Sequence, residues 1–318
     1  MRIHPFPSRS IAVLEALATV AIWGATFVAT KVALQEVSPA TVVWLRFTVG
    51  IAVLGLAAYA RHELSAPPRR HWPMLALLGF IGVALHQWLQ SNGLRTAAAT
   101  TTAWLVATTP IFIALLGWIA LRETLNWVQL CGIGVGALGV LTILSRGNLS
   151  ALLLSAPSEP GDILVLLSAP NWALYTILSR RVLSDISPSK MIFYVMLAGW
   201  LFITVWAFGF GPGVSQVGAL TWRGWVAIGG LGVFGSGLAY VMYHDALHVL
   251  PAPQLGVFLN LEPLVTLLLA APILGEALNF IVLLGGALIV VGIYLVNRRR
   301  SKVHGADVAG SVDIEGAL

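Results

Sequence analysis

Charged side chains are scarce in this sequence, and their scarcity decides its class. Asp, Glu, Lys and Arg make up 10% of the 318 residues, whereas a soluble domain carries about a quarter. The stretches 97–121, 125–145 and 191–222 contain none of the four. Each exceeds the roughly 18 apolar residues that indicate a bilayer span. An ordinary soluble domain is therefore excluded, and we expect the lipid bilayer to be the solvent of this chain.

Cysteine and catalytic motifs are scarce too. Cys131 is the only cysteine and lies in an apolar, glycine-rich stretch, which excludes an intramolecular disulfide and a thiolate metal site. The sequence has no His-Glu-x-x-His motif, no nucleophile with an evident base and no Walker-type loop. We therefore expect no enzyme activity, catalytic residue, metal or cofactor. The net charge of +5 comes from short basic clusters between apolar stretches, so we expect no nucleic-acid partner.

Apolar runs between breaks rich in charge, proline or glycine predict an all-α membrane protein of ten helices. Its segments are expected at 11–34, 40–60, 72–94, 98–121, 125–145, 162–182, 190–210, 222–247, 252–274 and 277–297. The linker 148–161 is too short for a soluble domain, and the polar tail 301–318 is expected to be disordered.

The distribution of Lys and Arg predicts the orientation. Thirteen of the 18 fall on the side of the N-terminus and four on the opposite side, with Arg46 set aside as buried in the second span. Because positively charged short loops stay in the cytoplasm, we expect both termini to be cytoplasmic. The expected location is the bacterial inner (plasma) membrane.

The sequence contains an internal repeat. A shift of 149 residues places Trp23 on Trp172, and a shift of 153 places Pro110 on Pro263. A four-residue length difference after the second helix of each half explains the change of shift. The chain therefore divides into repeats at 1–147 and 162–300.

Each repeat contains five predicted helices, and an odd number makes the second repeat enter the membrane from the opposite side. Inverted repeats suit a carrier, because exchanging the roles of the halves opens one midplane site to each side in turn. Duplication in a structural or channel protein is the alternative.

Short motifs recur in order along 11–297. They are Trp23-Gly24, Lys31, Ser38-Pro39, Leu45-Arg46, Pro110, Leu121-Arg122-Glu123, Gly132, Gly139, Asn171-Trp172, Ser187-Pro188, Glu262-Pro263, Leu274-Gly275-Glu276 and Gly285-Gly286. In order and spacing they resemble the EamA-type transporters of the drug/metabolite transporter superfamily. The resemblance implies two inverted five-helix repeats around a central cavity, and export of amino acids, related metabolites or toxic compounds, usually driven by an ion gradient. The second half departs by placing Ala173 after Trp172 and by lacking a match for Arg46, which leaves the subfamily open.

Polar and aromatic side chains gather on the first, third, fourth, sixth, eighth and ninth helices, which the resemblance places around the cavity. Indole and phenol rings offer cation–π surfaces to an ammonium group, and amides and imidazoles hold a carboxylate. The substrate-binding candidates are Trp23, His86, Gln90, Trp104, Asn171, Trp172, Tyr175, Tyr240, Tyr243 and Asn260, with Asn92 and His244 beside them. Helix packing and the interfacial aromatic belt are the alternative roles.

Glu262 lies near the midpoint of the ninth predicted helix, too far from either surface for its carboxylate to reach bulk water. We take it as the candidate proton-coupling residue. Pro263 predicts a helix kink, because proline lacks an N–H and clashes with the carbonyl of Leu259, and Pro110 predicts the same in the first half. Since the repeat mate of Glu262 is Thr109, the kink needs no acid, and a hydrogen bond to a neighbouring helix is the alternative role.

Other embedded charges are expected to be structural. Glu15 and Arg46 lie near helix ends, from which their side chains can reach the interface, and an acidic partner is the alternative for Arg46. The pair His244-Asp245 is expected to be solvated at a loop, with a gate contact as the alternative. Glu123 and Glu276 are expected to favour the N-terminus of the helix that follows each.

Together these patterns predict a secondary transporter that exports small metabolites, foremost amino acids or related compounds, by alternating access. Protons are the candidate coupling ions, and the lipid bilayer and a small-molecule substrate are the expected partners. Mixed aromatic and amide side chains favour a zwitterion, since an anion needs several midplane cations. A broad-specificity drug or toxic-compound exporter and a passive channel are the alternatives, and the oligomeric state stays open.

Overall fold

The structure is a computed structural model that describes residues 8–62, 64–121, 125–148, 159–183, 186–250, 255, 258–277 and 279–297, and all regular secondary structure in these ranges is helical. The first half contains α1 (Arg9–Leu34), α2 (Pro39–Ala60), η1 (Arg69–His71), α3 (Trp72–Gly79), η2 (Phe80–Leu85), α4 (His86–Gly93), α5 (Ala99–Val106), α6 (Thr109–Leu121) and α7 (Trp127–Ser145). The second contains α9 (Pro160–Leu183), α10 (Pro188–Gly209), η3 (Val217–Ala219), α11 (Trp222–Gly230), η4 (Leu231–Leu238), α12 (Ala239–Val249), α14 (Glu262–Leu274) and α15 (Phe280–Asn297).

Nine helical stretches in the described ranges are long and apolar enough to cross a membrane, and α14 is a shorter apolar helix. The predicted all-α membrane fold is confirmed. The predicted helix ends that fall in these ranges lie within about three residues of the observed ones, because charged and Pro/Gly-rich breaks mark where apolar runs stop. The start of the ninth predicted helix, the linker 149–158 and the tail 301–318 lie outside the described residues.

Local chemistry fixes where several helices begin. Ser38 accepts a hydrogen bond from the Thr41 amide while Pro39 occupies the first position of α2. Asn126 forms a capping box with Gln129 at the start of α7, each side chain bonding the other's backbone.

The same two interruptions occur in both halves. The helix is interrupted two to three residues before each proline, at 107–108 before Pro110 and at 260–261 before Pro263, because proline lacks the N–H that would bond the carbonyl four residues back and its ring clashes with that carbonyl. The third span of each half widens into a π-helical segment, η2 or η4, whose residues correspond under the repeat shift. π-helical turns are rare and cluster at functional sites.

Contacts between the halves are mirrored. A Cβ added at Gly50 of α2 would lie 2.6 Å from Ser236 Cβ of η4, and one added at its mate Gly199 of α10 would meet Val83 of η2. Because Val83 is the mate of Ser236, the two contacts are copies of one contact made with the halves exchanged. This is the packing expected of two related units that face each other.

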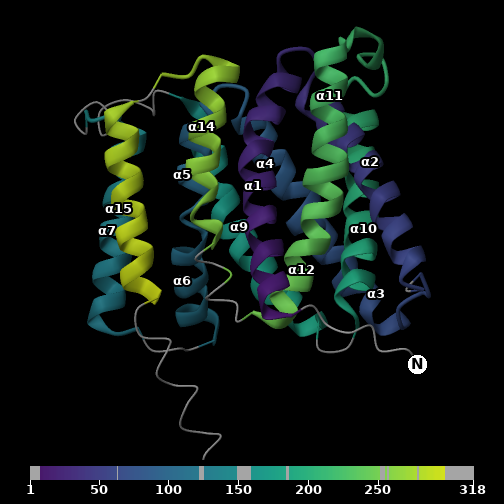
Figure 1. Cartoon of the computed structure of the whole chain (residues 1–318), viewed down its shortest axis with the longest axis horizontal. Helices are drawn as coiled ribbons and strands as arrows, with labels where there is room; N and C mark the ends of the chain where they lie inside the picture. The colour runs from purple at the N-terminus through teal and green to yellow at the C-terminus, as the bar shows by residue number, and fades with distance from the viewer. Residues whose placement is uncertain are drawn as a thin grey trace, which may run out of the picture.

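Helices α7 and α15 stand side by side at one end of the longest axis, while α3 and α10 lie at the other (Figure 1). Glycines bring the pair together: an added Cβ at Gly132 would lie 2.7 Å from the Gly292 carbonyl, and one at Gly139 would lie 2.6 Å from the Gly285 carbonyl. In lipid, such close approach supplies the dispersion contacts that hold helices together. We call the face where α1 begins the N-terminal face and the face where α1 ends the distal face.

Candidate functional site

A cavity of about 160 Å³ lies between the two halves. Its walls come from α1, α4, α5, α6, α9, α12 and α14, which belong to the six expected spans, with additions from α2 and α15. The lining runs from Thr30 and Leu94 near the distal face to Asn297, the last residue of α15.

The repeat relation organises this lining. Ten pairs of repeat mates both line the cavity, and they are Trp23/Trp172, Thr26/Tyr175, Phe27/Thr176, Thr30/Ser179, Gln87/Tyr240, Gln90/Tyr243, Ser91/His244, Val106/Leu259, Ala107/Asn260 and Thr109/Glu262. A wall built from both members of so many pairs encloses the axis that relates the halves. The cavity is therefore central to the inverted repeat.

An aromatic cluster centred on Trp23 forms one wall. Its ring centroid lies 5.3 Å from that of Tyr240 and 5.0 Å from that of Tyr243. The mate Trp172 meets Trp23 edge to face at 6.3 Å and lies 4.8 Å from Tyr175. The Trp23 indole N–H donates to the Gly235 carbonyl at 3.2 Å, which fixes the ring against η4. Packed rings of this kind give a rigid apolar wall with cation-binding faces.

Several polar atoms at the cavity are buried without a partner. His86 Nδ1, Tyr175 Oη and Asn260 Oδ1 accept or donate no hydrogen bond within the described part of the chain, and all three residues line the cavity. A buried polar atom without a partner costs about 1–3 kcal/mol. A change in the cavity wall that gave these atoms a partner would therefore be favourable.

Glu262 is the first residue of α14 and is buried, with 8% of its surface exposed. It lines the cavity, as Arg46 does, and in the described ranges no ion pair involves its carboxylate. The hydroxyl of Thr266 instead donates to the Glu262 backbone carbonyl at 3.0 Å and to the Gly24 carbonyl at 2.8 Å. Glu262 thus lines the cavity from the start of α14.

Arg46 differs from its expected role. The sequence suggested a side chain that reaches the interface, but Arg46 is 5% exposed and lines the cavity. Its Nε donates to Ser236 Oγ at 3.0 Å and its Nη1 to Gln87 Oε1 at 3.3 Å. The expectation failed because helix position sets depth in the membrane and says nothing of direction. Glu15 likewise has a buried, unpaired Oε2 within the described residues.

Two predicted substrate-binding residues lie outside the cavity lining. Trp104 is buried against Gly286, where an added Cβ would lie 2.5 Å from the indole ring. Asn171 donates its amide to the Ile81 carbonyl at 2.6 Å, beside the π-helical segment η2. Asn92 similarly bonds the Trp88 carbonyl of its own helix. The other predicted site residues in the cavity lining are Trp23, His86, Gln90, Trp172, Tyr175, Tyr240, Tyr243, Asn260, Glu262 and Pro110. Pro263 is buried and is not part of the lining.

The lining also contains polar residues that the sequence analysis did not select: Arg46, Gln87, Ser91, Thr26, Thr30, Thr176 and Ser179. Thr26 and Thr30 follow Trp23 at positions i+3 and i+7, which share one helix face. A search for polar residues at helical spacing from Trp23 therefore identifies both threonines.

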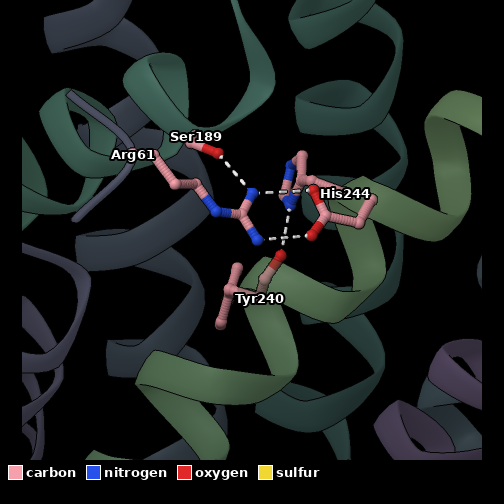
Figure 2. A network of polar contacts seen from close by, with 5 residues as sticks. Arg61, Ser189, Tyr240 and His244 are labelled. Atoms are coloured by element: carbon pink, nitrogen blue, oxygen red, sulfur yellow. Dashed lines mark hydrogen bonds and ion pairs between the residues drawn. The ribbon is translucent and has the colours of Figure 1, made fainter. Parts of the chain in front are cut away.

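On the N-terminal face, Arg61 at the end of α2 joins two helices of the other half (Figure 2). It pairs with Asp245 of α12 at 2.8 Å and donates to Ser189 of α10 at 2.9 Å. Loop solvation is the first expectation for Asp245 and a gate contact the alternative, and in the structure Asp245 forms an ion pair with the other half. The neighbouring His244 Nδ1 lies 2.8 Å from the Tyr240 carbonyl.

On the distal face, helix ends of one half are capped by charges from elsewhere in the chain. Lys31 donates to the Leu94 and Ala97 carbonyls. Glu276 accepts from the Ala99 and Thr100 amides at 2.7 and 3.1 Å, so it caps α5. The expected cap on the following helix is wrong for Glu276, because Asn279 caps α15 instead. The mate Glu123 lies outside the described residues.

Comparison with known proteins agrees with this architecture. Residues 10–145 and 159–298 each match the EamA-like transporter family. A Streptantibioticus cattleyicolor protein named "Probable terminal-alkyne amino-acid exporter" is 30% identical, over 91% of this chain and 94% of its own.

An Archaeoglobus fulgidus protein named "Uncharacterized transporter" is 27% identical over 89% of this chain and 96% of its own, and the Escherichia coli "Uncharacterized inner membrane transporter YedA" is 27% identical over 86% and 87%. One solved structure shares the fold, with a TM-score of 0.66 and 23% identity over 92% of this chain and all of that one. With both halves matched, the chain belongs to the EamA-like transporter family.

Proposed function

We propose that this chain is a secondary transporter that exports amino acids or closely related small metabolites by alternating access. The observation that carries the proposal is the central cavity lined by ten pairs of repeat mates. A site on the axis that relates two inverted units meets equivalent walls when the units exchange roles.

Contacts at the two faces support the alternating mechanism. The lining reaches Asn297 on the N-terminal face, while Lys31 and Glu276 hold helix ends together on the distal face. This arrangement corresponds to a carrier loaded from the N-terminal face. Release then requires the Lys31 and Glu276 contacts to open while the N-terminal face closes.

The chemistry of the cavity favours an amino acid. The aromatic wall around Trp23 suits an ammonium group or an apolar side chain, and the Streptantibioticus cattleyicolor relative is named an amino-acid exporter. A broad-specificity exporter of toxic compounds is the second candidate, because packed rings also bind drugs without polar recognition.

Glu262 is the proposed proton-coupling residue. In proteoliposomes, uptake of labelled amino acids is expected to accelerate when a pH gradient is imposed and to lose that acceleration in Glu262→Gln. Its mate provides the control: Thr109→Val changes the equivalent cavity position without removing a titratable group. Unchanged proton coupling in Glu262→Gln contradicts this role.

Flux kinetics separate a carrier from a channel. A carrier saturates with substrate and is accelerated by unlabelled substrate on the opposite side, whereas a channel does neither. Linear flux without exchange contradicts the proposal, and saturable flux of unrelated drugs at rates equal to amino acids supports the second candidate.

The proposed location is the inner membrane with both termini in the cytoplasm, as the thirteen-to-four distribution of Lys and Arg favours. A C-terminal green fluorescent protein fusion is expected to fluoresce, and a C-terminal alkaline phosphatase fusion to be inactive. The opposite pattern contradicts this orientation.

A further inference from the structure

We propose that Arg46 binds the carboxylate of the transported substrate and thereby selects compounds that carry one. The inference rests on the proposed function, since it assigns a recognition group to the same cavity. It comes from three observations: the donors of Arg46 that the protein leaves unused, the apolar mate of Arg46 in the second half, and the position of Arg46 in the cavity wall.

The protein satisfies Arg46 only in part. A guanidinium has five N–H donors, and the hydrogen bonds to Ser236 and Gln87 use two of them. Both partners are neutral, and no carboxylate of the described residues pairs with Arg46. The guanidinium carbon also lies 5.3 Å from the ring of Phe47. Within the described part of the chain, the positive charge and three donors of Arg46 are therefore not used by hydrogen bonds or ion pairs.

The second half shows that packing does not need this arginine. Val195 is the mate of Arg46, and the mirrored contact is the same: the Arg46 carbonyl faces Gly232, as the Val195 carbonyl faces Gly79. The partner Ser236 likewise corresponds to Val83. Where one copy of this contact between the halves pairs Val195 with Val83, the other pairs Arg46 with Ser236, a charge with a hydroxyl, which points to a role beyond packing.

The position of Arg46 in the cavity indicates which kind of ligand it binds. Arg46 is 5% exposed and lines the cavity, so a ligand in the substrate site can reach it. A buried guanidinium pairs best with a planar carboxylate, which it binds through two parallel hydrogen bonds. Gln87 and Ser236 hold the guanidinium plane in place before the ligand arrives.

The rest of the wall fits the other end of an amino acid. Tyr240 interacts electrostatically with both Arg46 and Glu262, and its ring packs against that of Trp23. A substrate whose carboxylate lies on Arg46 therefore points its ammonium toward the aromatic faces and the Glu262 carboxylate. One cation and one acid beside an aromatic wall match a zwitterion, and the single cation does not suit a multiply charged anion.

Binding tests Arg46 without depending on transport. Detergent-purified full-length protein is heated with L-leucine, L-methionine and L-phenylalanine and with the amide of each, which keeps the ammonium and side chain but lacks the carboxylate. We expect at least one acid to raise the melting temperature with an apparent Kd about tenfold or more lower than that of its amide. Arg46→Gln is expected to abolish this preference, and Arg46→Lys to retain part of it.

Flux separates this inference from the proposed function. In proteoliposomes, the wild type is expected to carry the acid in preference to its amide. Saturable transport of acid and amide at equal rates overturns the role of Arg46 while transport stands. Arg46-dependent binding of acids without any flux contradicts the proposed function but supports carboxylate binding by Arg46.

Two variants control for indirect effects. Arg223→Gln removes a positive charge at an exposed position on the distal face, outside the cavity lining, and is expected to change neither preference. If Arg46→Gln does not fold, the inference is tested with Arg46→Lys and with the preference of the wild type for acid over amide. Equal binding of acid and amide by the wild type overturns the inference.

Discussion

Arg46 in the first half and Val195 in the second occupy the same place in two copies of one helix contact, yet Arg46 lines the cavity and Val195 is buried in an apolar cluster. Thr109 and Glu262 differ in the same way, with the acid now in the second half. The glycines that let helices touch are shared by the repeats, whereas the charges of Arg46 and Glu262 in the cavity lining are not. Duplication thus explains the scaffold, and the differences between mates locate the chemistry.

The largest effect is expected at the shared glycines. A Cβ at Gly79 would meet the Gly199 amide and the Val195 carbonyl at 2.7 Å, so Gly79→Val strikes backbone that cannot move aside. Gly232→Val meets Val49 and the Arg46 carbonyl in the mirrored contact. We expect both variants to lose most folded protein in size-exclusion chromatography, since overpacking costs about 1–3 kcal/mol or more.

Gly134→Ala is the control for these variants, because an added Cβ at Gly134 has no atom within 4 Å in the described chain. Tolerance of Gly79→Val but not of Gly232→Val would show that the mirrored packing is energetically unequal.

The next effect is expected when one copy of the contact between the halves is converted to the residues of the other copy. The double variant Arg46→Val with Ser236→Val reproduces the valine pair Val195 and Val83. We expect its melting temperature to be equal or higher, because replacing a buried charge by a packed apolar side chain is often neutral or stabilising by about 1–4 kcal/mol. Uptake of a transported amino acid is expected to fall about tenfold or more. A large loss of thermal stability would instead assign Arg46 to the scaffold.

A third test moves the acid between mates. Glu262→Thr is expected to abolish stimulation by a pH gradient, and adding Thr109→Glu to restore part of it, because the two positions line the cavity from opposite halves. The readout is the ratio of uptake with and without the gradient. Full coupling in Glu262→Thr alone would show that the proton is carried elsewhere.

A smaller effect is expected at the distal face. Lys31→Met removes two hydrogen bonds to the Leu94 and Ala97 carbonyls, each worth about 1 kcal/mol when half exposed. The open distal state then becomes more populated. Alkylation of a cysteine placed at Thr30, in a Cys131→Ala background, is expected to speed up a few fold from the distal side. An alkylation rate equal to that of the parent would show that Lys31 does not help to close the distal face.

The smallest effect concerns Glu36, in the loop after α1. Its carboxylate accepts from the Thr221 hydroxyl and amide at 2.7 Å, and these hydrogen bonds, the hydroxyl first, lower the pKa of Glu36. A lowered pKa means that the contact stabilises the fold above the ordinary pKa of 4.5 and is lost as pH falls through the folded value. Glu36→Gln is therefore expected to lower the melting temperature slightly at pH 7. The difference from the parent should vanish in acid, and a difference that grows in acid would contradict this sign.

Much of this architecture could be predicted because the membrane imposes one rule, namely a long apolar run for each crossing. Aromatic lining residues such as Trp23 and Tyr240 were also found, since they stand out in such runs. Arg46 was missed because its distance from a helix end predicts depth but not direction. Trp104 was misplaced because the close approach of Gly286, which makes room for its ring, comes from a helix far along the chain. The cap that Glu276 places on α5 crosses between halves and leaves no local pattern.

The two π-helical segments determine the direction in which the side chains after them point around the helix axis. One additional residue in a helical turn rotates everything after it by about 100° around the axis. η2 immediately precedes His86 and Gln90, and η4 immediately precedes Tyr240 and Tyr243. Deleting a single residue from either segment would swing these side chains toward lipid or a neighbouring helix while leaving the span hydrophobic and of nearly equal length. Each widened turn thus rotates the helix that follows it, so that these side chains of the third span face the axis that relates the two halves.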